Sequence, residues 1–214
     1  MTDKLFELAK ADDAAALTAA LKGADLTRIH NDAGESLYRF ALFHGHAKAA
    51  EAVKAQGGLG FHDAALVNDV ARMDALLGSA PWSIDLLSPD GWTALHLAGF
   101  FGSDAALERL LARGANARVM GRAFEQNLAL HAAAAGRRIG KPAYAKLIAA
   151  TGDPDVLQKQ GYTALMIAAS NGFTAAVEVL LAASADRTIK LADGKSAADI
   201  ARDRGHADLA KLLD

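Results

Sequence analysis

A short sequence pattern returns three times along this chain. Residues 90–99 read DGWTALHLAG, residues 160–169 read QGYTALMIAA, and residues 193–201 read DGKSAADIA. A unit of this length cannot bury its own apolar face, so several copies must stack on one another. The repeat therefore predicts a solenoid, which offers an elongated binding surface more readily than an enclosed catalytic pocket.

The remaining copies can be aligned on the position of Thr93. This position falls at Asp3, Ser36, Leu59, Thr93, Asn127, Thr163 and Ser196, with spacings of 33, 23, 34, 34, 36 and 33 residues. A period of about 33 residues with one deletion and one insertion accounts for the whole chain. We therefore expect a single domain over residues 1–214, with seven units that begin near residues 1, 34, 57, 91, 125, 161 and 194.

The repeated residues resemble those of the ankyrin family. The similarity lies in the Thr-Ala-Leu-His-Leu-Ala core at 93–98, the Gly-His pairs at 45–46 and 205–206, and the unit endings at 110–116 and 180–186. The resemblance implies an all-α, ankyrin-type repeat solenoid of about seven helix-turn-helix units with short β-hairpin-like fingers. It also implies that the inner helices and the fingers line a concave face, and it names no partner.

Local patterns predict helices without the family. Apolar residues between 105 and 111 form one helical stripe, and Gly114 suits the left-handed conformation that ends many helices. Thr93, Thr163 and Ser196 stand where helix N-caps are expected, because their hydroxyls can accept from first-turn amides. We interpret these residues as structural.

Two departures from the period carry information. Only 23 residues separate Ser36 from Leu59, so we expect the finger between the second and third units to be missing. The unit near 125 gains three residues around 137–142, between its two helices, where glycines and a proline disfavour a continuous helix. This loop either extends a binding surface or is a tolerated surface insertion.

The sequence offers little for catalysis. It contains no cysteine, no nucleophile elbow, no His-Glu-x-x-His zinc motif and no phosphate-binding loop, so we expect no enzyme activity and no cofactor. Residues 1–10 lack the unbroken apolar run of a signal peptide, and no segment is apolar enough to span a bilayer. These features predict a cytoplasmic protein that does not contact a membrane.

Histidines recur at fixed positions of the repeat. His62, His96 and His131 share one position, and His46 and His206 share another. We interpret them as structural hydrogen-bonding residues. The pair at 44 and 46 lacks further metal ligands nearby, so we expect no metal site.

The repeat register places an aromatic patch in the fourth unit. The two residues before the glycine that ends each inner helix should face the groove, and in this unit they are Phe100 and Phe101. Trp92 and Tyr162 occupy the finger position that the resemblance also points toward the groove. Exposed aromatic clusters often anchor partners, although each of these side chains could instead fill the core.

The middle of the chain is basic. Between residues 109 and 146 there are eight basic side chains and one acid, Glu125, which gives +7 in a chain of formal charge −2. This asymmetry suggests an acidic partner surface, whereas a solvated helix face is the simpler alternative.

These patterns predict a non-catalytic protein-interaction module, monomeric on its own, that docks an unidentified protein on its concave face. The basic middle favours an acidic surface on that protein. Two alternatives remain: binding of a polyanion or nucleic acid through the basic middle, which the pI near 6.4 disfavours, and a small-ligand site in the gap left by the missing finger. The candidate partner-binding residues are Trp92, Phe100, Phe101, Arg122, Phe124, Arg137, Arg138 and Tyr162.

Overall fold

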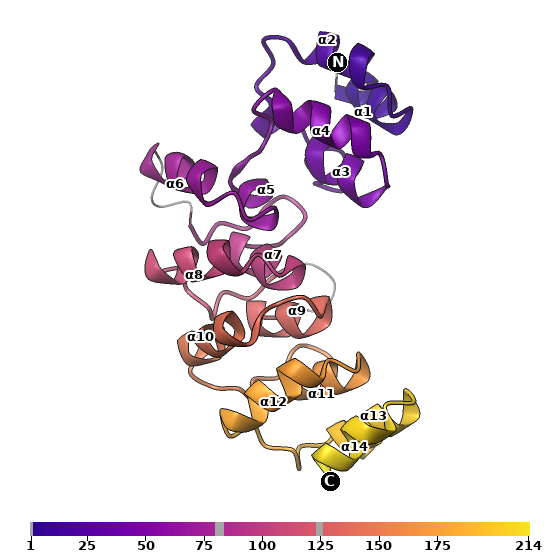
Figure 1. Ribbon diagram of the computed structural model, residues 1–214, viewed down its shortest axis with the longest axis vertical. Helices are drawn as coiled ribbons and strands as arrows, with labels where there is room; N and C mark the ends of the chain where they lie inside the picture. The colour runs from indigo at the N-terminus through magenta and orange to yellow at the C-terminus, as the bar shows by residue number, and fades with distance from the viewer. Residues whose placement is uncertain (1, 80–83, 123–125) are drawn as a thin grey trace.

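The computed structural model describes residues 2–79, 84–122 and 126–214, and within these ranges the chain is helical with no β-sheet (Figure 1). The first half contains α1 (Thr2–Lys10), α2 (Ala14–Leu21), the 3₁₀ helix η1 (Leu26–Arg28), α3 (Leu37–Phe43), α4 (Ala47–Ala55), α5 (Phe61–Leu66), α6 (Val70–Ser79), α7 (Ala94–Phe101) and α8 (Asp104–Ala112). The second half contains α9 (Ala129–Gly136), α10 (Lys141–Thr151), α11 (Ala164–Ser170), α12 (Thr174–Ala182), α13 (Ala197–Asp203) and α14 (Ala207–Leu213).

Consecutive helices pair and the pairs stack in chain order from the N-terminus to the C-terminus (Figure 1). From α5 onward one row is continuous, because α5, α7, α9, α11 and α13 each contact the next helix of the row. The second row behaves similarly through α6, α8, α10 and α12. The predicted all-α repeat solenoid is therefore confirmed.

The predicted helix starts are confirmed where a hydroxyl caps the helix. The Oγ1 of Thr93 accepts from the amide of His96 at 3.3 Å, and Thr163 and Ser196 accept from the equivalent amides at 3.2 Å each. Each hydroxyl satisfies one of the amides that the first helical turn leaves without a backbone partner.

The predicted register is wrong by one residue in two units, and in the first unit Asp3 lies inside α1 rather than at its N-cap. The N-cap of α5 is Gly60 rather than Leu59, and the N-cap of α9 is Leu128 rather than Asn127. Neither Gly60 nor Leu128 has a side-chain oxygen that would mark the cap. The two helix starts were therefore placed from the repeat spacing alone, and both were wrong by one residue. The corrected register puts Asp63, and not His62, at the position of His96 in the repeat.

Short turns project between most helix pairs. In segments 31–35, 88–92, 158–162 and 191–195 the first amide donates to the last carbonyl at 2.7 to 3.0 Å. Within the described ranges these fingers form only two isolated antiparallel bridges, between His30 and Ser36 and between Lys190 and Ser196. Residues 56–60 instead pass directly from α4 to α5.

This direct passage lets two fingers meet that a regular array would separate. Segment 31–35 lies against segment 88–92, and a Cβ on Gly34 would stand 2.6 Å from the backbone nitrogen of Asp90. Gly34 also has a φ of +80°, which favours glycine. The contact therefore requires glycine for two reasons.

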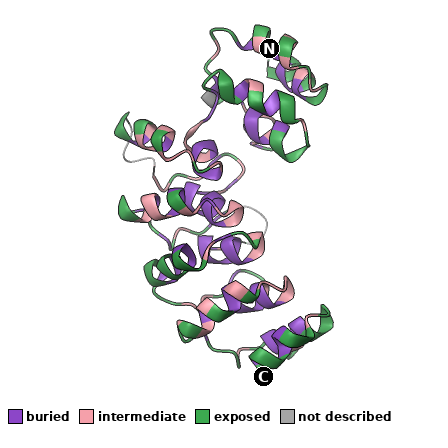
Figure 2. Cartoon of the chain, viewed as in Figure 1, coloured by how far each residue is buried: buried purple, intermediate pink, exposed green. Residues whose placement is uncertain are grey.

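The buried apolar side chains form two separate clusters. One runs from Leu5 to Leu59 and the other from Ala64 to Leu213. Figure 2 shows buried residues concentrated along the inner faces of the helices in both parts. The division falls at the connector 56–60, so polar and aromatic contacts, together with the partly buried Val67 that packs against the first cluster, have to hold the two parts together.

Candidate functional site

A pocket of about 770 Å³ lies where the two parts of the chain meet. Its walls come from two segments, 33–44 and 90–101, and no described residue of α5 or α6 lines it. The helix α5 has six residues, whereas α7 has eight, so the third pair leaves space between its neighbours. We call this space the aromatic pocket.

A continuous series of rings forms its apolar wall. Ring centroids of Trp92 and Phe100 are 6.0 Å apart, those of Phe100 and Phe101 are 5.1 Å apart, and both pairs meet edge to face. The ring of Phe43 stacks on Phe101 at 5.6 Å with an interplanar angle of 5°. The structure thus brings together the predicted patch of Trp92, Phe100 and Phe101 and adds Phe43 from the other segment.

These rings are neither core residues nor fully exposed. Trp92, Phe100 and Phe101 are half-buried, and 43% of Phe43 is exposed. None of the four belongs to the buried residues of either hydrophobic cluster. A partner that covered them would remove further apolar surface from water, which is the main favourable term in association.

A buried ionic network lies behind the pocket. Arg39 is 1% exposed, its Nη1 donates to Asp90 Oδ2, and its Nε lies 3.0 Å from Asp63 Oδ1 without alignment for a hydrogen bond. The hydroxyl of Ser36 donates to the same Asp63 oxygen at 2.9 Å. Burial raises the pKa of Asp63, and the neighbouring Arg39 and Ser36 oppose this shift. Opposite charges on α3, on α5 and in the finger 88–92 therefore link the two parts of the chain.

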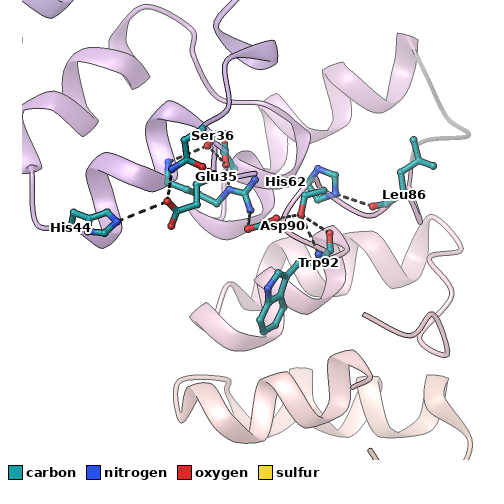
Figure 3. Close-up of polar contacts among 11 residues, drawn as sticks. Glu35, Ser36, His44, His62, Leu86, Asp90 and Trp92 are labelled. Atoms are coloured by element: carbon teal, nitrogen blue, oxygen red, sulfur yellow. Dashed lines mark hydrogen bonds and ion pairs between the residues drawn. The ribbon is translucent and has the colours of Figure 1, made fainter. Parts of the chain in front are cut away.

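A second carboxylate lies on the pocket wall itself. Glu35 Oε2 accepts from Asn31 Nδ2 at 2.8 Å and lies 3.9 Å from His44 Nε2. The amide of Glu35 donates to Asn31 Oδ1 at 2.9 Å, which fixes the finger that carries it. Figure 3 shows Glu35 between His44 and Asp90.

The histidines behave as structural residues, as the sequence predicted. His96 Nε2 lies 2.9 Å from the carbonyl of Asn127, and His131 Nε2 lies 2.9 Å from the carbonyl of Val156. A carbonyl only accepts, so each Nε2 carries a proton and donates it. The Nδ1 of His131 accepts from the amide of Leu128 at 3.2 Å, so this ring is neutral. Burial lowers the pKa of His96 to about 4, which keeps its ring neutral at neutral pH.

Sequence reasoning missed the ionic network and Glu35. The corrected register places Arg39 and Asp63 at the repeat position that His96 and His131 occupy. The sequence did contain a signal for this network. A repeat position that holds a buried histidine in two units holds an arginine and an aspartate in two others. Glu35 and Asp90 are finger-tip residues, where carboxylates are so common that they carried no signal.

The other predicted residues lie apart from the aromatic pocket. Tyr162 is half-buried and lines a separate pocket of about 190 Å³ near Arg204. Phe124 lies outside the described residues. Arg122, Arg137 and Arg138 are exposed and form no ion pair within the described chain. The guanidinium carbon of Arg138 lies 5.9 Å from the centroid of Phe101, so only this arginine adjoins the patch.

Half of the eight basic side chains in the middle of the chain are paired with acids of other helices. Arg109 and Arg113 lie 2.9 and 3.6 Å from the carboxylate of Asp74, whose pKa the Arg109 hydrogen bond lowers. Lys146 pairs with Glu108 at 2.7 Å, Lys141 pairs with Glu178, and Arg118 donates to the carbonyl of Thr151. Because a carbonyl does not neutralise a guanidinium, the basic residues without an acidic partner in the described chain are Arg118, Arg122, Arg137 and Arg138.

The described residues lack two further kinds of functional feature. No group of three or more histidine, aspartate or glutamate side chains is arranged to hold a metal ion in that part of the chain. No helix there has both the length and the apolar character needed to cross a bilayer.

Models of known protein families match two segments of this chain. A family model described as "Ankyrin repeats (3 copies)" matches residues 130–214, and one described as "Ankyrin repeat" matches residues 90–121. Together they cover more than half of the chain. No curated protein shows a significant match to the sequence. Ankyrin repeats are generally protein–protein interaction modules, and this chain belongs to the ankyrin repeat family.

Proposed function

We propose that this protein is a non-catalytic binding module whose partner protein docks on the aromatic pocket. The observation that supports this most directly is the series of four half-exposed rings, Trp92, Phe100, Phe101 and Phe43, around a pocket of about 770 Å³. Rigid aromatic side chains bury a large area at little entropic cost, so they dominate the binding energy of many interfaces.

Charge beside the pocket favours an acidic region on the same partner. Arg138 lies next to Phe101 and Arg137 precedes it in the loop between α9 and α10. Acidic side chains of a docked partner would therefore meet unpaired guanidinium groups on this side. The inserted loop then extends the binding surface, which is the first of the two roles expected for it.

The test is capture of partners from a native lysate. We compare the unmodified protein with the triple variant Trp92→Ala, Phe100→Ala, Phe101→Ala, and confirm by thermal melting that the variant is folded. A matched control removes three exposed apolar side chains elsewhere, with Met120→Ala, Leu157→Ala and Leu212→Ala. We expect a partner that the control retains and the folded triple variant loses.

One result of this capture experiment would contradict the proposal. A folded triple variant that retains every partner contradicts docking on the pocket. If the triple variant unfolds, single substitutions at Trp92 and at Phe101 replace it, since each removes part of the patch.

A small-ligand site is the second candidate, because about 770 Å³ lies within the range of roughly 300–1,000 Å³ that small-molecule sites occupy. A compound that raises the Tm of the unmodified protein and not that of the folded triple variant would support it. The ion pairs of Arg109, Arg113, Lys141 and Lys146 leave the polyanion alternative with less support.

A further inference from the structure

The charges that line the aromatic pocket have one sign. Among the described residues of its walls, the ionisable side chains are Glu35, His44 and Asp90, and no lysine or arginine is present. Arg39 lies behind the wall, and its guanidinium is already shared between Asp63 and Asp90. The pocket wall therefore presents carboxylate charge at Glu35 and Asp90, and the nearest unpaired cation of the described chain is Arg138, whose guanidinium carbon lies 5.9 Å from the centroid of Phe101.

The two carboxylates of the pocket wall differ in how many of their oxygens already accept a hydrogen bond. Asp90 uses Oδ2 for Arg39 and Oδ1 for the hydroxyl of Ser88. Glu35 uses only Oε2, which Asn31 holds, and its Oε1 contacts no donor within the described chain. With 21% of its side chain exposed, Glu35 is a fixed acceptor with one oxygen available.

Four aromatic rings line the same pocket as this acceptor. The rings of Trp92, Phe100, Phe101 and Phe43 carry negative charge on their faces, which attracts cations. A site that combines such faces with a carboxylate selects a positively charged group. Among side-chain cations, guanidinium fits best, because it is planar, weakly hydrated and able to stack on a ring while it donates to a carboxylate.

We propose that the aromatic pocket binds an arginine side chain of the partner, with its guanidinium on Glu35 and its aliphatic part against the rings of Trp92 and Phe101. This inference rests on the proposed docking function and adds the chemistry of the docked residue. It also orients the partner, because the arginine enters beside Glu35 while acidic neighbours face Arg137 and Arg138.

The first test uses small probes. N-acetyl-L-arginine amide is titrated into the ¹⁵N-labelled protein, and N-acetyl-L-citrulline amide serves as a neutral probe of nearly the same shape. We expect the indole Nε1–H of Trp92, assigned with Trp92→Phe, to shift with the arginine probe in a saturable way. Equal shifts with both probes, or equal affinity for the corresponding lysine amide, would overturn the assignment.

The second test supplies flanking contacts that small probes lack. A library of random peptides displayed on phage is selected on the unmodified protein, on Glu35→Gln and on the control Glu51→Gln. Glutamine keeps the oxygen that Asn31 needs, so the finger should remain intact, and Glu51 is an exposed acid outside the pocket. We expect arginine to be enriched at one peptide position with the unmodified protein and the control, and at least fivefold less with Glu35→Gln.

The outcomes separate this inference from the proposed function. If no arginine is enriched, or if Glu35→Gln enriches it equally, the arginine assignment is wrong even when the triple aromatic variant loses its partner. If arginine is enriched through Glu35 while the triple variant keeps every captured protein, the arginine site stands and docking of those proteins on the pocket is wrong.

Discussion

Phe43 and Phe101 stack in parallel although they belong to helix pairs that are not consecutive. Their centroids are 5.6 Å apart, and the intervening pair, α5 and α6, contributes no ring to the contact. The contact exists because residues 56–60 replace a finger with a direct connection. A deletion in the repeat thus creates both the pocket and the stacking that closes one side of it.

Loss of this stacking should weaken the fold slightly. We expect Phe43→Ala to lower the free energy of unfolding by about 1 kcal/mol more than Leu42→Ala, because ring pairs contribute roughly 0.5–1.5 kcal/mol beyond their buried area. Leu42 is a suitable control, since it is the preceding residue of α3 and is 38% exposed, close to the 43% of Phe43. Urea denaturation measures both values, and equal losses would show that the stacking contributes nothing.

Removal of one charge from the buried network should cost far more. Arg39→Met leaves Asp63 buried without its counterion, and we expect a loss of about 3–5 kcal/mol in the free energy of unfolding. The double variant Arg39→Met, Asp63→Leu removes the fully buried pair and should recover part of this loss, because only Asp90, whose side chain is 16% exposed, then lacks its counterion. Lys211→Met, which breaks the exposed pair with Asp208, should change stability by less than about 1 kcal/mol. A double variant as unstable as Arg39→Met alone would contradict this account.

Close packing between α7 and α9 should make Gly136 irreplaceable. A Cβ at this position would stand 1.8 Å from the carbonyl oxygen of Phe100. We expect Gly136→Ala to destabilise the protein by about 3 kcal/mol, because backbone has to move to relieve the clash. Gly78→Ala is the control, since a Cβ at Gly78 meets nothing within 4 Å and alanine favours the helix. Thermal melting of the two variants should give shifts of opposite sign.

Acid should destabilise the fold through His96. Its pKa is lowered by burial to about 4 in the folded protein, against 6.5 as its ordinary value. Between these values the unfolded chain binds a proton that the folded chain does not, so stability falls as the pH drops from 6.5 toward 4. In this range protonation at His96 lowers the free energy of unfolding by at most about 1.4 kcal/mol for each pH unit of acidification. Above pH 6.5 the contribution of His96 to the free energy of unfolding no longer changes with pH.

This pH dependence has a direct check. Titration of the His96 ring by NMR should show the neutral form with the proton on Nε2 at pH 5. In urea denaturation, His96→Gln should flatten the fall in stability between pH 6.5 and 4. A ring that is protonated at pH 5.5 in the folded protein would contradict the expectation.

The sequence predicted the fold better than the site, for identifiable reasons. Thr93, Thr163 and Ser196 mark helix starts because their local chemistry is sufficient, whereas Gly60 and Leu128 lack a capping oxygen and were misplaced by one residue. The meeting of Trp92, Phe100 and Phe101 follows from spacing within one unit. Phe43 and Glu35 line the pocket because two fingers pack together across the connector 56–60. No local sequence pattern indicates that these two fingers lie close to each other. The sequence between residues 109 and 146 does carry an excess of positive charge. In the folded chain, however, Asp74, Glu108 and Glu178 form ion pairs with four of its eight basic side chains.

The division of the apolar core at residues 56–60 has a thermodynamic consequence. A repeat array unfolds as one cooperative unit only while each repeat is coupled to the next through an apolar interface. Here the coupling between the block before Leu59 and the block after Ala64 is carried by charge, by exposed rings and by the partly buried Val67, which packs against the first cluster. Each block therefore has its own melting transition, and a molecule held in the aromatic pocket, which touches both blocks, draws the two transitions together.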